Sequence, residues 1–164
     1  MIGKTMDEKI LYTPIELSEL MQGDNCIIID IRDMEDYQEE HISGAVSVPD
    51  VFFYLSMTTP KGLNELHETF RKHFSEIGLS PEKTAIIYED AYDSRYGGSC
   101  RGYWLLKYLG HNKVGILDGG FSAWVDEGYS VDSDPVEIKP TTFEVKPNAE
   151  ILATKDEMIE ALKN

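Results

Sequence analysis

The sequence predicts an α/β fold in which a parallel sheet lies between two layers of helices. Three apolar runs of strand length carry this prediction, namely Cys26–Ile31, Thr84–Tyr88 and Val114–Leu117. Strands that are apolar on both faces are typical of parallel sheets, because helices cover both sides of such sheets. Segments with helical patterns separate the runs, so strands and helices alternate along the chain. With 164 residues, the chain suits one domain of ordinary size.

The first predicted helix runs from Pro14 to about Gln22. Thr13 and Glu16 form a capping box, Pro14 suits the first turn, and Gly23 suits the position after the last turn. A second, longer helix is predicted by one apolar stripe whose members recur at helical spacing and which ends at Gly78. The stripe consists of Leu63, Leu66, Phe70, Phe74 and Ile77.

Shorter elements fill the rest of the predicted sheet and its helical layers. A short helix is expected at 33–37, and a brief strand at 46–48 is closed by Pro49. The segment from about Ser99 to Leu109 is predicted to be helical, with Gly110 placed for a C-terminal cap. A tight turn at 118–120 leads into another short helix at 121–127.

The pattern weakens after residue 131. Residues 132–149 contain three prolines among polar residues, which predicts an extended connector between a first domain at 1–131 and a final helix within 150–164. That final segment repeats the capping box of the first helix, with Thr154 and Glu157 matching Thr13 and Glu16. The two boxes lie about one domain length apart, so the second indicates either the opening of another domain or a chance similarity between two capped helices.

Composition limits the classes of partner. The net charge of −15 argues against nucleic acid and against anionic membranes, because both bind basic surfaces. No run approaches the roughly 20 apolar residues of a membrane helix, and the first nine residues lack the apolar core of a signal peptide, so we expect a cytoplasmic protein. Two cysteines, Cys26 and Cys100, are too few for a disulfide scaffold, and Cys26 begins an apolar run typical of the core.

The stretch from Tyr88 to Gly110 has the strand, loop and helix order that builds anion sites. Backbone N–H groups at such a helix N-terminus favour negative charge, and a cysteine there should have a lowered pKa. Cys100 is therefore a candidate reactive thiol, and the alternative is a small buried residue in the first turn of a core helix, because free cysteine is among the most buried residue types. The other candidate anion-binding residues of this stretch are Arg95, Gly97, Gly98, Ser99 and Arg101.

Four short motifs occur in order along the chain. They are Asp30-Ile31-Arg32, the string from Tyr37 through His41 and Gly44 to Val46, Ile86-Ile87-Tyr88 before the central loop, and Leu117-Asp118-Gly119-Gly120-Phe121 with Trp124 after it. Together they resemble the rhodanese family, the thiosulfate and 3-mercaptopyruvate sulfurtransferases. The resemblance is closest to the first domain of the two-domain members, and it implies a rhodanese fold with a parallel five-stranded sheet.

The resemblance also implies a chemistry. In catalytic members a cysteine directly after the strand accepts a sulfane sulfur from a small donor, becomes a persulfide, and passes the sulfur to a thiol or cyanide, with no cofactor. Here that position holds Glu89, and Cys100 lies at the far end of a longer loop, beside Arg101, which matches the arginine that closes the family's loop. The resemblance therefore implies that the chain is a non-catalytic first domain whose partner is a second rhodanese domain. The alternatives are a single-domain sulfurtransferase that uses Cys100 and an interaction module without sulfur chemistry.

The remaining motif residues suggest structural roles. Arg32 is expected to pair with Asp30 or Glu35, and His41 to form a hydrogen bond in the turn that contains Gly44. Asp118 is expected to cap the helix after Gly119-Gly120. The histidines show no ligand spacing, so no metal site is predicted. Trp124 and the pair Tyr103-Trp104 are predicted to lie in the core.

Overall fold

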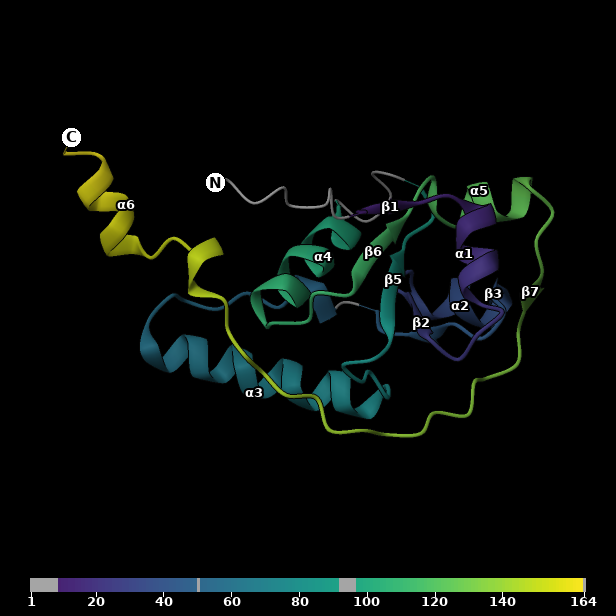
Figure 1. Ribbon diagram of the computed structural model, residues 1–164, viewed down its shortest axis with the longest axis horizontal. Coiled ribbons are helices and arrows are strands. Elements are labelled where there is room, and N and C mark those ends of the chain that lie inside the picture. Colours follow the sequence, from purple (N-terminus) through teal and green to yellow (C-terminus); the bar gives the residue numbers. More distant parts are fainter. Residues whose placement is uncertain (1–8, 50, 92–96, 164) are drawn as a thin grey trace, which may run out of the picture.

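A five-stranded parallel sheet forms the centre of the molecule, and this confirms the predicted fold class (Figure 1). The structure is a computed structural model that describes residues 9–49, 51–91 and 97–163. The strand order is β1-β6-β5-β2-β4, and every neighbouring pair is parallel. The three apolar runs are thus the three central strands. The strands are β1 (Leu11–Tyr12), β2 (Cys26–Asp30), β4 (Val46–Ser47), β5 (Thr84–Tyr88) and β6 (Val114–Leu117).

Helices cover both faces of this sheet. Successive side chains of a strand point to opposite faces, so Ile28 packs with α1 (Pro14–Leu20) and α5 (Gly120–Asp126), in a cluster that contains Leu17 and Trp124. Ile27 and Ile29 pack on the other face with α3 (Pro60–Glu76) and α4 (Gly98–Tyr108). Smaller elements complete the body: α2 (Met34–Glu39), η1 (Val51–Phe53), and an antiparallel pair of β3 (His41–Ile42) with β7 (Val131–Asp132).

The predicted helices are present, with their ends shifted by a few residues. Thr13 and Glu16 form the expected capping box, but α1 ends at Leu20 because Met21 is already its C-cap. The stripe of α3 is buried at Phe70 and Phe74. Near the first turn of that helix, the Thr59 side chain accepts a hydrogen bond from Gly62 N at 3.1 Å, which explains why α3 begins before the stripe does.

The two tryptophans have different environments. Trp124 is 1% exposed in the core, as predicted, whereas Trp104 is 41% exposed. The expectation that Trp104 is a core residue is therefore wrong. It lies on the outer side of α4, stacked on Tyr108 with ring centroids 5.4 Å apart. The apolar sequence of α4 does not by itself show which side faces the sheet.

The connector, residues 132–149, is extended and runs across the ends of two helices (Figure 1). Thr141 N donates to Ser75 O in the last turn of α3 at 2.9 Å, and Asn148 N donates to Tyr108 O at the end of α4 at 2.7 Å. The second bond satisfies a carbonyl group that a helix leaves without an intrahelical partner, and the first adds to the bond that Ser75 O accepts from Gly78 N. Between them, Phe143 is 3% exposed and packs on Phe74, with ring centroids 5.0 Å apart. The connector thus contributes to the core.

The last helix, α6 (Lys155–Ala161), follows a short 3-10 turn, η2 (Ala149–Ile151), and stands away from the sheet (Figure 1). It has the predicted capping box of Thr154 and Glu157. Its apolar side chains are exposed to solvent. Met158 is 55% exposed, whereas Leu17 at the corresponding position of α1 is fully buried. In the part of the chain that the structure describes, no helix is long and apolar enough to cross a membrane.

Candidate functional site

The candidate site lies where β5 ends and α4 and α5 begin. The backbone that follows β5 is held on the first turn of α5: Phe121 N donates to Glu89 O at 2.8 Å, and Ser122 N donates to Asp90 O at 3.0 Å. The carbonyls approach so closely because Gly120 has no side chain. A Cβ on Gly120 would lie 2.3 Å from Glu89 O, and its φ of +64° also favours glycine. The start of the loop therefore has a fixed direction.

The role predicted for Asp118 is wrong. Gly119, with φ +74° in the left-handed region, is the N-cap of α5, and no side chain caps that helix. The first N–H groups of α5 instead bind the carbonyls of the neighbouring loop, as described above. The double glycine of this turn thus allows α5 to hold the segment that follows β5.

Glu89 lies at the anion site that the sequence predicts between β5 and α4. Its side chain is 3% exposed, and Oε1 accepts hydrogen bonds from Ser99 Oγ at 2.5 Å and from Ser99 N at 3.4 Å. Ser99 lies in the first turn of α4, which begins at Gly98 after the N-cap Gly97. The N-terminus of a helix stabilises negative charge, so the carboxylate lies where a bound anion would otherwise lie.

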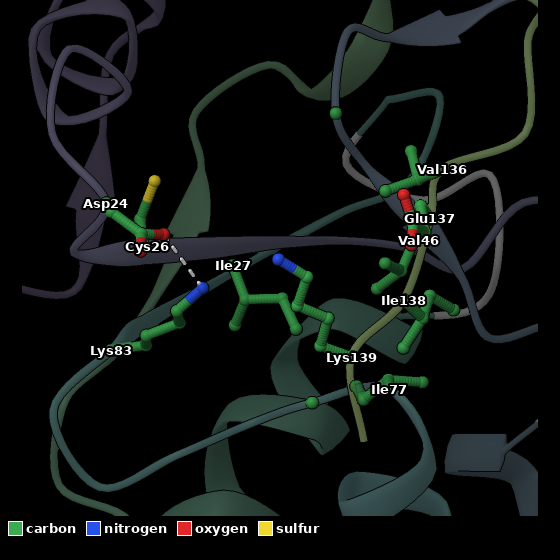
Figure 2. Close-up of a pocket in the computed structure, with 12 residues that line it drawn as sticks. Asp24, Cys26, Ile27, Val46, Ile77, Lys83, Val136, Glu137, Ile138 and Lys139 are labelled. Atoms are coloured by element: carbon green, nitrogen blue, oxygen red, sulfur yellow. Dashed lines mark hydrogen bonds and ion pairs between the residues drawn. The ribbon is translucent and has the colours of Figure 1, made fainter. Parts of the chain in front are cut away.

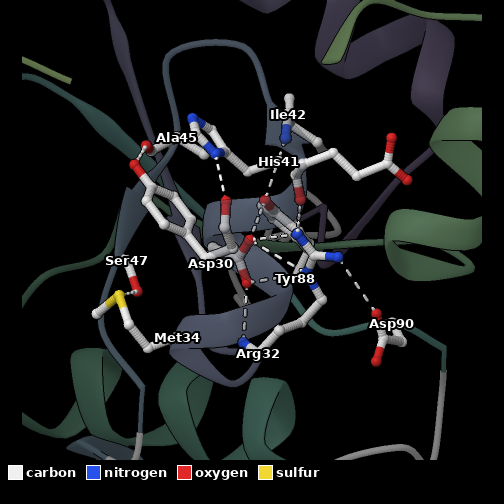
Figure 3. A network of polar contacts seen from close by, with 11 residues as sticks. Asp30, Arg32, Met34, His41, Ile42, Ala45, Ser47, Tyr88 and Asp90 are labelled. Carbon is white, nitrogen blue, oxygen red and sulfur yellow. Dashed lines mark hydrogen bonds and ion pairs between the residues drawn. The ribbon is translucent and has the colours of Figure 1, made fainter. Parts of the chain in front are cut away.

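A buried polar network supports the site from β2 (Figure 3). Asp30 and Arg32, which are 0% and 3% exposed, form an ion pair with Arg32 Nη2 2.9 Å from Asp30 Oδ2. Arg32 N also donates to Asp30 Oδ1 at 2.8 Å. The Tyr88 hydroxyl donates to Asp30 as well. Burial and the neighbouring Asp30 carboxylate raise the pKa of Tyr88, so the phenol keeps its proton. Among the described residues, Asp30 and not Glu35 forms the ion pair with Arg32.

Arg32 also joins this network to the loop (Figure 3). Nη1 donates to Asp90 Oδ1 at 3.5 Å, and Nη2 donates to Glu40 O at 2.6 Å. The guanidinium lies over the ring of Phe121, with Cζ 3.8 Å from the ring centroid. One arginine therefore links the end of β2, the segment that follows β5 and the first turn of α5, and its own charge is balanced by acids.

His41 lies in β3, beside the turn that contains Gly44, and is fully buried. Its Nδ1 is 2.7 Å from Tyr37 O, and the two rings stack with centroids 3.9 Å apart. The Tyr37 hydroxyl donates to Ala45 O at 2.8 Å, after Gly44 has turned the chain with φ +82°. These contacts hold the turn together. Among the residues that the structure describes, no cluster of three or more histidine, cysteine or acidic side chains could hold a metal ion.

Cys100 is exposed in the first turn of α4. The alternative that it is a small buried residue is therefore wrong. Arg101, the next residue, donates from Nε to Phe52 O at 3.3 Å and lies over the ring of Phe53, 4.5 Å from its centroid. Arg95, the other cation predicted for this loop, lies outside the described residues.

Cys26 lies at a second place, at the beginning of β2. It borders a cavity of about 280 Å³ between the sheet edge and residues 136–139 of the connector (Figure 2). Burial raises the pKa of this thiol, which disfavours the reactive thiolate. Lys83 on the same wall forms an ion pair with Asp24 at 3.1 Å. Neither observation makes this cavity a better candidate for sulfur chemistry than the loop after β5.

Sequence reasoning missed three contributors to the site. It assigned no role to the Ser99 hydroxyl as the partner of Glu89, none to Asp90 as a partner of Arg32, and none to Phe121 as the surface on which Arg32 lies. An acid directly after an apolar strand, followed by a loop and a helix whose first turn contains serine, was the available signal for Glu89 and Ser99. The other two contacts depend on the order of strands in the sheet.

Comparison with known proteins identifies the family of this chain. A model of the rhodanese-like domain matches residues 13–127, which is more than half of the chain. The chain belongs to the rhodanese family. Thiosulfate sulfurtransferase of Rattus norvegicus is 31% identical over 134 residues, covering 79% of this chain and 43% of that protein. The protein with the same description from Pseudomonas aeruginosa is 28% identical over 149 residues, covering 87% and 53%.

A solved rhodanese structure shows the same fold. The 3-mercaptopyruvate sulfurtransferase SseA of Escherichia coli superposes with a TM-score of 0.77 at 24% identity, covering 95% of this chain and 62% of that one. The chain spans about half the length of the curated relatives that it matches. Rhodanese-type sulfur transfer is thus the general activity of the proteins to which it is similar.

Proposed function

We propose that this chain is the non-catalytic first domain of a rhodanese-type sulfurtransferase. The complete protein would transfer a sulfane sulfur from thiosulfate or mercaptopyruvate to a thiol or cyanide. The transfer would pass through a cysteine persulfide of a second rhodanese domain. One observation carries the proposal: the carboxylate of Glu89 is buried on the first turn of α4 and bonded to Ser99.

The chemistry of sulfur transfer conflicts with that carboxylate. The reaction needs a nucleophilic sulfur at the start of the loop and preorganised N–H groups that stabilise its negative charge. A carboxylate cannot form a persulfide. Its charge would also repel thiosulfate in a poorly solvated site, where Coulomb interactions are stronger than in water. The arrangement around Glu89 is suited to a stable scaffold.

Two further observations support a second domain as the partner. Helix α6 repeats the capping box of α1, but its apolar side chains Met158 and Leu162 are exposed, whereas Leu17 of α1 is buried. The relatives that match this chain are about twice as long as the matched region. An apolar helix face of this kind is stabilised by packing on another folded unit.

A second candidate function rests on Cys100, which is exposed beside the N-terminus of α4. It would make this chain an autonomous sulfurtransferase. A third, an interaction module without sulfur chemistry, would apply if the longer protein also lacked activity.

Mass spectrometry after incubation with thiosulfate or mercaptopyruvate separates these functions. We expect no gain of a sulfur atom by this chain, no thiocyanate formation from cyanide, and the same results for Cys100→Ser and Cys26→Ser. An adduct that Cys100→Ser alone abolishes would overturn the proposal in favour of the autonomous enzyme. The protein translated from the complete reading frame should form the persulfide on a cysteine outside residues 1–164, and failure to do so would favour the interaction module.

A further inference from the structure

A small apolar cavity lies on the α3 and α4 side of the sheet. Its volume is about 200 Å³, and its walls come from segment 52–58, the first turns of α3, one face of α4, and Leu152 after η2. Its α4 wall consists of Arg101, Trp104, Leu105 and Tyr108, which share one face of the helix by their spacing. It is separate from the site around Glu89, although both use α4.

The walls offer a ligand hydrocarbon surface. Two of the polar groups on the lining already have partners inside the protein: Ser56 Oγ donates to Gly62 O at 2.7 Å, and Tyr108 Oη is 3.0 Å from His67 Nε2. A cavity without convergent polar groups holds water poorly. Such a cavity therefore favours an apolar occupant, because the occupant displaces little bound water and the hydroxyl groups of Ser56 and Tyr108 keep their partners inside the protein.

The size and the rim of the cavity limit the ligands that it could bind. An apolar cavity of about 150 Å³ is large enough to bind benzene in other proteins. This cavity is somewhat larger, and its mouth carries exposed apolar side chains, with Leu55 86% exposed and Trp104 41% exposed. A ligand that entered would cover part of this apolar rim. Arg101 is the charged side chain on the lining, which disfavours a cationic ligand.

We propose that this cavity is a binding site for one small aromatic or branched-alkyl group, carried by a neutral or anionic small molecule. The site lies on the same helix whose first turn, through Ser99, holds Glu89. A bound ligand would change the environment of Trp104, which forms part of the cavity wall. The proposal does not depend on sulfur chemistry, because the walls alone select the ligand.

The two tryptophans allow a direct test by ¹H–¹⁵N NMR of the indole N–H groups during titration with benzene. We expect the Trp104 resonance to shift until the site is saturated, with a dissociation constant for benzene of about 1 mM or below, which is within the range for a ligand of this size. The Trp124 resonance should not move, because Trp124 lies in the core on the opposite face of the sheet. Benzoate should bind, and benzylamine should bind more weakly than benzene. A Trp104 signal unchanged at 10-fold higher benzene, or tighter binding of benzylamine, would overturn the proposal.

Variants locate the binding within the protein. Leu63→Phe and Leu66→Phe each add volume inside the cavity and should each weaken benzene binding by at least 10-fold. Thr69→Phe is the matched control, because Thr69 lies on the same helix but lines a different groove, and it should bind benzene normally. Equal binding by all three variants would contradict the assignment. Sedimentation without ligand provides a further check, since a dimer that Leu63→Phe disrupts would show that a second copy fills the cavity and would overturn the small-molecule site.

Discussion

Removing the ring of Phe143 tests whether the connector is part of the first domain's core. Phe143 is 3% exposed and packs on Phe74 and His111, with ring centroids 5.0 and 6.1 Å away. Truncating a buried phenylalanine to alanine removes its transfer free energy and leaves a cavity, which together cost about 3 to 5 kcal/mol. We therefore expect Phe143→Ala to lower the free energy of unfolding by about that amount.

Urea unfolding followed by circular dichroism measures this loss. In thermal unfolding followed by the same signal, the midpoint temperature should fall by about 6 to 20 °C, since each kcal/mol shifts it by roughly 2 to 4 °C in a domain of this size. Ile138→Ala is the matched control, because Ile138 lies on the same connector but is 40% exposed, and it should cost less than about 1 kcal/mol. A loss below about 1 kcal/mol for Phe143→Ala would refute the reasoning, because the connector would then be dispensable to the core.

Three further predictions concern the hydroxyl that binds Glu89, the turn at Gly120 and the buried His111 after α4. Ser99→Ala removes the hydroxyl that donates to buried Glu89 and should cost about 1 to 3 kcal/mol in urea unfolding, while the double variant with Glu89→Leu should recover part of the loss; an unchanged midpoint for Ser99→Ala would contradict the role of that hydroxyl. Gly120→Ala should destabilise by more than Gly128→Ala, because both glycines have positive φ but a Cβ on Gly120 alone would meet a carbonyl, at 2.3 Å; equal losses would contradict the close approach. Burial lowers the pKa of His111, so the unfolded state takes up its proton more readily: the neutral imidazole's contribution should be complete above about pH 6.5 and should be lost as the pH falls from there toward the folded pKa. Urea unfolding at several pH values should show that the free energy of unfolding depends less on pH in His111→Gln than in the wild type. Identical slopes of this free energy against pH would exclude the role of His111.

The sequence allows the fold to be predicted because its strongest signals are local. The runs at β2, β5 and β6 are continuous and apolar, and the capping boxes at Thr13 and Thr154 mark the starts of two helices. The ends of helices are less well predicted, since they depend on the conformation of single residues such as Met21. The prediction that Trp104 is a core residue was wrong because α4 has apolar residues on several sides. Their spacing therefore does not show which side of the helix faces the sheet.

The site was predictable only where partners are close in sequence. Arg32 and Asp30 are two residues apart, and their pairing follows from charge and position. Arg32 and Asp90 are 58 residues apart, and their contact requires β2 and β5 to be neighbours in the sheet. The replacement of a sulfur nucleophile by Glu89 could be seen in the sequence, but its burial on Ser99 depends on where the loop turns, and Gly120 and α5 determine that turn.

The connector also affects when this domain can fold during synthesis. The Phe143 backbone N–H donates to Ser75 Oγ across 68 residues of chain, and Phe143 enters a core whose other members have been translated long before. Until residues 143–148 leave the ribosome, carbonyl groups at the end of α4 lack their connector partners and a gap remains beside Phe74. Contacts of such long sequence separation form late and slowly. A nascent chain that stops before the connector should therefore remain open to proteases and chaperones, and one that stops just after it should be protected.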